Sequence, residues 1–193
     1  MVGRAGALIV LVGSILLAVD ARRGAGQLPP QVIDREYEIK AAYLYNFGLY
    51  VTWPQGAVPN DQDQFVIGVL GKDPFDTNLD RLAAAKKVGG RKIVIQRFKS
   101  MADYKPSHIL FISGGDGTKG SADERLAEAV RKLKNLPVLL VSDTEGHAAK
   151  GAIISLLIDE NRVKFEVNPA VAKQAGLQIS SKLLQLGKIV SKT

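Results

Sequence analysis

The two histidines are the side chains best suited to acid–base or metal chemistry, because the sequence contains no cysteine. His108 opens an apolar run, and His147 lies in the turn-like sequence Glu145-Gly146-His147. Neither belongs to a His/Asp/Glu cluster with the spacing of metal ligands, and neither has an evident serine and aspartate partner for a catalytic triad. We therefore predict no catalytic residue, no metal site and no cofactor. A hydrolase that uses His108 or His147 is the alternative.

The carboxylates closest together in sequence have structural explanations. Asp73 and Asp76 flank a proline at the expected start of a helix, where the helix dipole stabilises negative charge. Asp143 and Glu145 close an expected strand and enter a turn. None of these pairs has the arrangement of an acid–base pair, so we predict that the protein is not an enzyme.

Two further polar motifs also have simple structural interpretations. The glycine-rich segment 114–120 lies between an expected strand and helix, but it matches neither dinucleotide-binding nor P-loop spacing. We interpret it as a mobile loop. Asn168 precedes Pro169, and we predict that its side chain caps a short helix beginning there; a ligand role is the weaker alternative.

Charge and cysteine content exclude other classes of function. The formal net charge is +7, from 26 Lys and Arg against 19 Asp and Glu. These cations are spread along the chain without the basic, aromatic-interleaved runs of nucleic-acid binders, so we predict no nucleic-acid partner. Anionic lipids or cell-wall polymers are an alternative, but we favour solvated, scattered charges. Without cysteine, thiol catalysis and disulfides are excluded.

The N-terminus has the pattern of an export signal. Arg4 supplies a positive charge, and residues 5–19 form an apolar run shorter than the ~20 residues that span a bilayer. We predict a signal peptide over 1–21, with Val19 and Ala21 at the −3 and −1 positions of the cleavage site. An uncleaved membrane anchor is the alternative. No later segment is long and apolar enough to span a membrane.

The mature chain is expected to begin with a flexible leader. Gly24 and Gly26 offer a second cleavage site, and residues 22–33 are rich in glycine and proline, which disfavour helix and strand. We predict a single domain over 34–193, since the chain is too short for two full domains. The predicted location is the periplasm.

Strands alternate with helices through most of the predicted domain. Helices are predicted over 34–51, 73–88 and 121–134, and strands over 65–71, 92–98, 108–112 and 137–141. Such alternation indicates βαβ units and a largely parallel sheet. Because helix 34–51 is apolar on most sides, we expect it to be packed between other elements.

The C-terminal part has a different pattern. Strands 152–158 and 163–167 are separated by only four residues, which predicts an antiparallel hairpin. A short helix follows from Pro169 to Gly176, and Ser180 is predicted to cap a last helix that reaches Val190. The expected fold is a three-layer α/β sandwich: a mixed sheet with a parallel portion and a C-terminal hairpin, covered by helices on both faces.

Several phrases of the sequence, in order, resemble the YfiR-like family of periplasmic proteins. They are IKAAYLYNF at 39–47, followed by VTWP at 51–54, IGVLGKDPF at 67–75, HILFI at 108–112, KFEVN at 164–168 and GLQISSKLL at 176–184. Together they span nearly the whole predicted domain. Two positions depart from the family pattern: Ser107 stands where many members have cysteine, and His147 stands where an aromatic residue is common.

The resemblance implies a regulator and not an enzyme. The best-known member represses a membrane-bound diguanylate cyclase by binding its periplasmic sensor region, and an outer-membrane lipoprotein titrates that repressor. The implied partner is therefore the periplasmic domain of an inner-membrane sensor, either a diguanylate cyclase or a histidine kinase, with an outer-membrane lipoprotein as a second candidate. Cyclic-di-GMP signalling and biofilm formation would follow, and homodimer formation is left open. Redox control through disulfides cannot operate here, because there is no cysteine.

A periplasmic sensor of a small ligand or peptidoglycan fragment is the alternative function. In parallel α/β sheets, ligands bind in the crevice at the carboxyl ends of the strands. In this chain that edge would include Gly71, Lys72, Ser113, Gly114 and Asp143. A regulator instead needs an apolar contact patch, so we expect exposed aliphatic or aromatic side chains that are grouped together.

Overall fold

A computed structural model describes residues 35–58, 63–114 and 119–191. The predicted signal peptide, the leader and residues 115–118 of the glycine-rich segment lie outside the described residues. Within them, no helix is long and apolar enough to cross a membrane.

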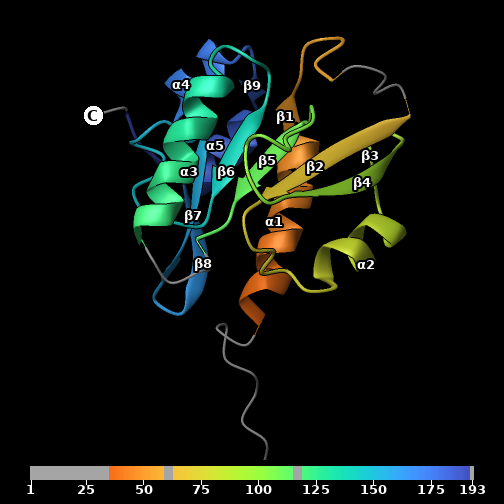
Figure 1. The fold of residues 1–193 in the computed structure, drawn as a ribbon, viewed down its shortest axis with the longest axis horizontal. Coiled ribbons are helices and arrows are strands. Elements are labelled where there is room, and N and C mark those ends of the chain that lie inside the picture. The colour runs from red at the N-terminus through yellow and green to blue at the C-terminus, as the bar shows by residue number, and fades with distance from the viewer. Residues whose placement is uncertain (1–34, 59–62, 115–118, 192–193) are drawn as a thin grey trace, which may run out of the picture.

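A curled, mixed sheet of eight strands forms the centre of the fold (Figure 1). Its order is β10-β8-β7-β6-β5-β2-β4-β3. The strands are β2 (Gln64–Leu70), β3 (Lys87–Val88), β4 (Arg91–Phe98), β5 (Ile109–Ile112), β6 (Leu139–Ser142), β7 (Ile154–Asp159), β8 (Arg162–Val167) and β10 (Lys188–Ile189). Neighbours pair in parallel except in the β3–β4 and β7–β8 hairpins. The predicted α/β fold class, with its parallel portion and C-terminal hairpin, is confirmed.

Helices cover both faces of this sheet. The helices α1 (Glu36–Tyr50) and α2 (Asn78–Ala85) pack on one face, and α3 (Lys119–Lys132) packs on the other. Alternation along the buried strands supplies both interfaces, since successive side chains point to opposite faces. In β5, Ile109 and Phe111 join the cluster with α1, whereas Leu110 and Ile112 join the cluster with α3.

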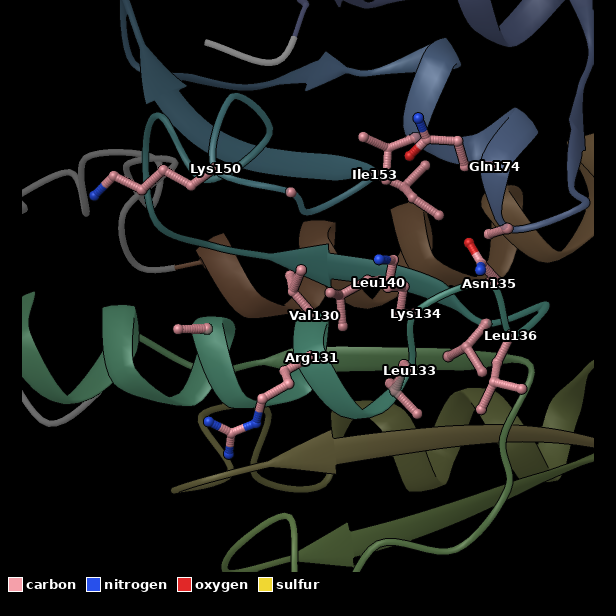
Figure 2. A pocket seen from close by; sticks show the side chains of 15 residues that line it. Val130, Arg131, Leu133, Lys134, Asn135, Leu136, Leu140, Lys150, Ile153 and Gln174 are labelled. Carbon is pink, nitrogen blue, oxygen red and sulfur yellow. The ribbon is translucent and has the colours of Figure 1, made fainter.

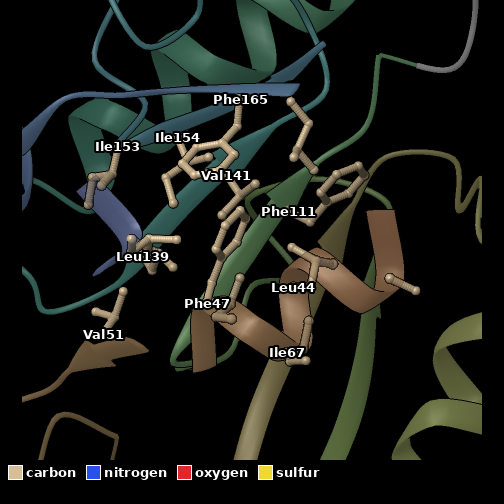
Figure 3. Close-up of a cluster of buried hydrophobic side chains, with 14 of the residues drawn as sticks. Leu44, Phe47, Val51, Ile67, Phe111, Leu139, Val141, Ile153, Ile154 and Phe165 are labelled. Atoms are coloured by element: carbon tan, nitrogen blue, oxygen red, sulfur yellow. The ribbon is translucent and has the colours of Figure 1, made fainter. Parts of the chain in front are cut away.

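Side chains of α1 lie in the middle of the larger hydrophobic core (Figure 3). Leu44 and Phe47 are fully buried, and the ring of Phe47 meets that of Phe165 edge-on at 5.5 Å between centroids. As predicted, this helix is packed between other elements, since it contacts α2 as well as the strands β3 and β8. It is not covered on every side, because Ala42 and Leu49 face away from the core and are exposed.

The region before β4 differs from the prediction at both ends of its helix. Asp73 does not cap the helix; its side chain accepts the N–H of Phe75 at 2.8 Å in a local turn, and α2 starts only at Asn78. The helix ends at Ala85, and β3 then forms a hairpin with β4 through Gly89 and Gly90. Both glycines have positive φ, 56° and 81°, as a tight hairpin turn of this hand requires.

The last helix of the C-terminal segment is also shorter than predicted. The helix α4 (Pro169–Gln174) is present as expected, but α5 (Ser181–Leu186) ends before Gly187, and Ile189 belongs to β10 beside β8. A second, two-stranded sheet joins β1 (Val51–Thr52) to β9 (Gln178–Ile179). Strands of two residues carry no periodicity, so the sequence pattern does not reveal them.

Candidate functional site

The carboxyl edge of the parallel strands gathers the residues expected to line a crevice. Gly71 follows β2, Ser113 and Gly114 follow β5, and Asp143 follows β6. The Asp143 carboxylate accepts the N–H of Gly114 at 2.6 Å through Oδ1. Gly114 has no room for a Cβ, which would lie 2.8 Å from the Thr144 hydroxyl. This edge is therefore tightly built around one buried carboxylate, while Lys72 lies exposed beside it.

The first turns of α1 close this edge. The Tyr37 hydroxyl donates to Asp143 Oδ2 at 3.1 Å, and Lys40 Nζ lies 3.6 Å from the same oxygen. Lys40 is only 2 % exposed and also pairs with Glu36. Burial, and then the negative charge of Asp143, raises the pKa of Tyr37 well above its usual range, so it remains a donor. Because Asp143 has three partners inside the protein, it is not an open ligand-binding group.

His147 has a serine and an aspartate partner that the sequence did not reveal. Its Nδ1 lies 2.8 Å from the Ser142 hydroxyl, and its Nε2 lies 2.9 Å from Asp123 Oδ1. The prediction that His147 lacks such partners is wrong. Asp123 comes from α3, 24 residues before the histidine, and no local spacing could indicate their contact.

The arrangement nevertheless differs from an accessible nucleophile with its base. Ser142 and His147 are both 0 % exposed. The Ser142 oxygen accepts the Thr144 N–H at 3.2 Å, so its proton is directed at His147 Nδ1, and the histidine donates from Nε2 to Asp123. Burial lowers the pKa of His147, which favours the neutral ring. The tautomer is set by Asp123, whose carboxylate can only accept the proton of Nε2. The set locks the connection between β6 and β7 to α3.

His108 is packed in an aromatic cluster at the other end of the parallel strands. Its ring stacks on Phe65 with centroids 4.5 Å apart, and Val66 donates its N–H to Nδ1 at 3.0 Å. Arg91 Nη1 lies 3.1 Å from Nε2, and the Trp53 indole donates to the backbone oxygen of His108. The ring is fully buried and holds β5 against β2. The two histidines therefore do not share a site.

The remaining predicted polar residues have structural contacts. Asn168 caps α4 as predicted: its Oδ1 accepts the Val171 N–H at 3.2 Å, and its Nδ2 donates to Ala148 O. Arg97 bridges Asp73 and Asp80, which ties α2 to β4. Across residues 35–58, 63–114 and 119–191, no three His, Asp or Glu side chains come together as a metal site.

An apolar concavity lies elsewhere, between α3 and α4 (Figure 2). It has a volume of about 420 Å³ and extends from Val130 on α3 and Leu133 just after it, across Leu140 and Ile153, to Val171 on α4. We call it the α3–α4 groove. Sequence reasoning missed it, because its walls come from three segments that are separated in sequence: 127–140, 150–153 and 171–175.

Large exposed apolar side chains occur in small groups. Among the described residues, Leu49 and Tyr50 are adjacent at the end of α1, and Leu186 and Ile189 flank the turn before β10. Leu136 is 47 % exposed at the α3–α4 groove, and Ile158 stands alone at the end of β7. The expected grouping is thus limited to pairs and to one groove.

Comparison with known proteins identifies the family. The family model described as YfiR/HmsC-like matches residues 37–188. The chain belongs to the YfiR/HmsC-like family. Its match starts in the first turn of α1 and ends in β10, so it includes every element that builds the two core clusters. No curated protein matches the chain.

Solved structures resemble this YfiR/HmsC-like chain only distantly. A conserved domain protein from Vibrio cholerae O1 biovar El Tor str. N16961 is 18 % identical, with a TM-score of 0.50 over 81 % of this chain and 60 % of its own. This likeness concerns the fold alone, and the chain spans less than two thirds of that protein. An ABC domain in complex with L-Trp from Streptococcus pneumonia is 13 % identical over 65 % of this chain and 55 % of its own; its TM-score of 0.46 is too low to establish a shared fold.

The phrases that resemble the YfiR/HmsC-like family are largely buried. Phe47, Ile67, Phe111 and Phe165 all belong to the core around α1. Ser107, at the position where many members have cysteine, is fully buried, and its hydroxyl lies 3.4 Å from that of Tyr104. The resemblance therefore reflects how the fold is packed and does not by itself mark a binding site.

Proposed function

We propose that the protein is an exported regulator that binds the periplasmic domain of an inner-membrane sensor and represses it. The best candidate for the sensor is a diguanylate cyclase. The observation that carries this proposal is the family match over residues 37–188. A second feature supports it: Ser142 and His147 of the Ser142–His147–Asp123 set are fully buried and hydrogen-bonded inside the protein, which suits a binding protein better than a hydrolase.

Regulation by binding requires a difference in affinity between two states of the sensor. Shifting a partner from 1:99 to 99:1 in favour of its inactive state takes a preference of about 5.5 kcal/mol. A few buried apolar anchors with a polar rim supply such a preference at protein interfaces. The pair formed by Leu49 and Tyr50 at the end of α1 offers one such anchor.

Deleting the gene tests the proposal directly. We expect cellular cyclic-di-GMP, measured by mass spectrometry, to rise in the deletion strain and to return to normal when the full chain is supplied. The matched control is a chain that starts at Arg22 behind an initiating methionine, which stays in the cytoplasm and should not complement. Unchanged cyclic-di-GMP in the deletion strain would contradict repression of a cyclase.

Export is tested separately by N-terminal sequencing of the protein in periplasmic extracts. We expect a mature N-terminus near Arg22 or Gln27. Intact Met1 recovered from the membrane pellet would show an uncleaved anchor instead.

Because the chain has no cysteine, single cysteines introduced at Leu49 or Leu186 give unique crosslinking sites for capturing an inner-membrane sensor. Failure of both sites to capture any sensor would count against a regulator that acts through these surfaces.

A further inference from the structure

The α3–α4 groove combines an apolar floor with polar ends (Figure 2). Aliphatic groups form its floor and walls: Val130, Leu133, Leu136, Val138, Leu140, Ile153, Val171 and Ala175. In the close-up, Arg131 and Lys150 extend at one end, while Leu136 and Gln174 lie at the other. At about 420 Å³, the groove falls within the range of small-molecule sites, which are mostly apolar with a few polar groups.

Every charged side chain that lines the groove is a cation. These are Arg131, Lys134 and Lys150, and no Asp or Glu is among the lining residues. Lys150 is paired with Asp123 at 2.8 Å. Neither Arg131 nor Lys134 forms an ion pair with a carboxylate in the described part of the chain. By contrast, the neighbouring Lys132 lies 3.5 Å from Glu128 and donates to the Met101 oxygen.

The exposure of Leu136 is imposed by the backbone. The chain leaves α3 through Asn135, whose φ is 61°, and the Leu136 N–H donates to Leu133 O at 2.9 Å. Val138 then donates its N–H to Leu136 O at 2.8 Å. This tight turn holds a half-exposed leucine at the rim of the groove, beside Lys134. An apolar group placed there would bury surface without any rearrangement of the turn.

We propose that the α3–α4 groove binds a small amphiphilic carboxylate, a molecule with one apolar chain and one anionic head. The apolar chain lies against Val130, Leu136 and Val171, the partly exposed apolar side chains of the groove, and the carboxylate pairs with Lys134. A cation without a carboxylate partner in the protein favours binding of an anion. A charge-assisted hydrogen bond beside the apolar floor should give the anion a higher affinity than an uncharged molecule of the same length. Binding of this kind does not depend on which sensor the protein regulates.

Three ligands of equal chain length separate charge from apolarity. The protein purified from the periplasm is titrated by calorimetry with decanoate, decanol and decylamine, each below its micellar concentration. We expect saturable 1:1 binding of decanoate and at least tenfold weaker binding of decylamine, with decanol in between. Equal affinity for decanoate and decylamine, or no saturable decanoate binding, would overturn the proposal. Binding to vesicles of anionic phospholipid without binding of decanoate would point to a membrane surface and would overturn it as well.

Matched variants locate the site. Lys134→Gln should weaken decanoate binding at least fivefold and leave decanol binding unchanged, whereas Lys182→Gln, on exposed α5, should change neither. Leu136→Asp should weaken decanoate binding more than tenfold, while Leu186→Asp, at a leucine that is 76 % exposed away from the groove, should not. All four positions are exposed, so circular dichroism should show an intact fold. Equal effects of the groove and control variants would place decanoate elsewhere and refute the assignment.

Discussion

At the scale of single residues, His147 is a buried base held neutral by its surroundings. Burial lowers its pKa, and the hydrogen bond to Asp123 only partly offsets this effect. In the unfolded chain a histidine titrates near its usual value of about 6.5. Below that pH the unfolded state therefore takes up a proton that the folded state does not. Stability contributed by His147 is complete above about pH 6.5 and is lost as the pH falls towards the pKa of the folded state.

The difference in unfolding free energy between the wild type and His147→Gln should therefore become smaller in acid. We expect the variant to be less stable than the wild type at pH 7.5, because Ser142 and Asp123 lose their partner, and the difference to shrink by pH 5.5. Urea unfolding at a series of pH values measures both proteins, and the difference between them cancels the titration of groups that do not contact His147. A difference that stays constant from pH 7.5 to 5.5 would show that His147 is not buried in its neutral form.

Lys40 presents the opposite case, a buried charge that must keep its partners. Replacing it by methionine would leave Asp143 buried next to Glu36 without a cation, and losing one member of a buried pair costs about 3–5 kcal/mol. We expect Lys40→Met to lower the urea midpoint by a matching amount with an unchanged slope. Arg35→Met, which breaks the exposed pair with Glu38, is the control and should leave the midpoint unchanged. Equal midpoints for the two variants would argue against a structural role for Lys40.

At the scale of elements, α4 depends on one side chain for its start. Asn168 accepts from the first turn of the helix and also donates to Ala148, so it joins α4 to the connection after β6. Asn168→Ala should destabilise the protein by about 1–2 kcal/mol, because it removes the cap. Asn168→Ser, which keeps an uncharged accepting oxygen at the cap but loses the donor to Ala148, should recover part of this loss in urea unfolding. If Asn168→Ser is no better than Asn168→Ala, the cap contributes nothing.

Long periodic elements could be predicted from the sequence, and short or non-local features could not. The helix α1 and the strands β2, β5 and β8 carry apolar patterns set by burial, so they appear near their predicted positions. β3 and β10 are two residues long, and they form only because a neighbouring strand offers its edge. The Ser142–His147–Asp123 set and the α3–α4 groove join segments far apart in sequence, which no local pattern reports.

At the scale of the whole molecule, the two cores share one sheet. Each central strand gives alternate side chains to the α1 cluster and to the α3 cluster, so neither face can lose its order alone. Phe47→Ala and Leu126→Ala, in opposite clusters, should destabilise the protein by about 3–5 and about 2–5 kcal/mol respectively. Circular dichroism and the fluorescence of Trp53, the single tryptophan, should follow one transition. Separate transitions by the two probes would show that the faces unfold independently.

The pairing of β1 with β9 has a consequence for the time at which the fold can be completed. Val51 lies beside Ile179, and Phe47 packs on Phe165, so the helix nearest the start of the domain finds its neighbours near the end. Whether the chain leaves a ribosome or a translocation channel, α1 emerges more than a hundred residues before these partners. Its contacts with α2 can form early, but the surface around Phe47 and Val51 stays partly uncovered until almost all of the chain has arrived. A protein built in this way resists folding too early, which is the condition that passage through a membrane in unfolded form requires.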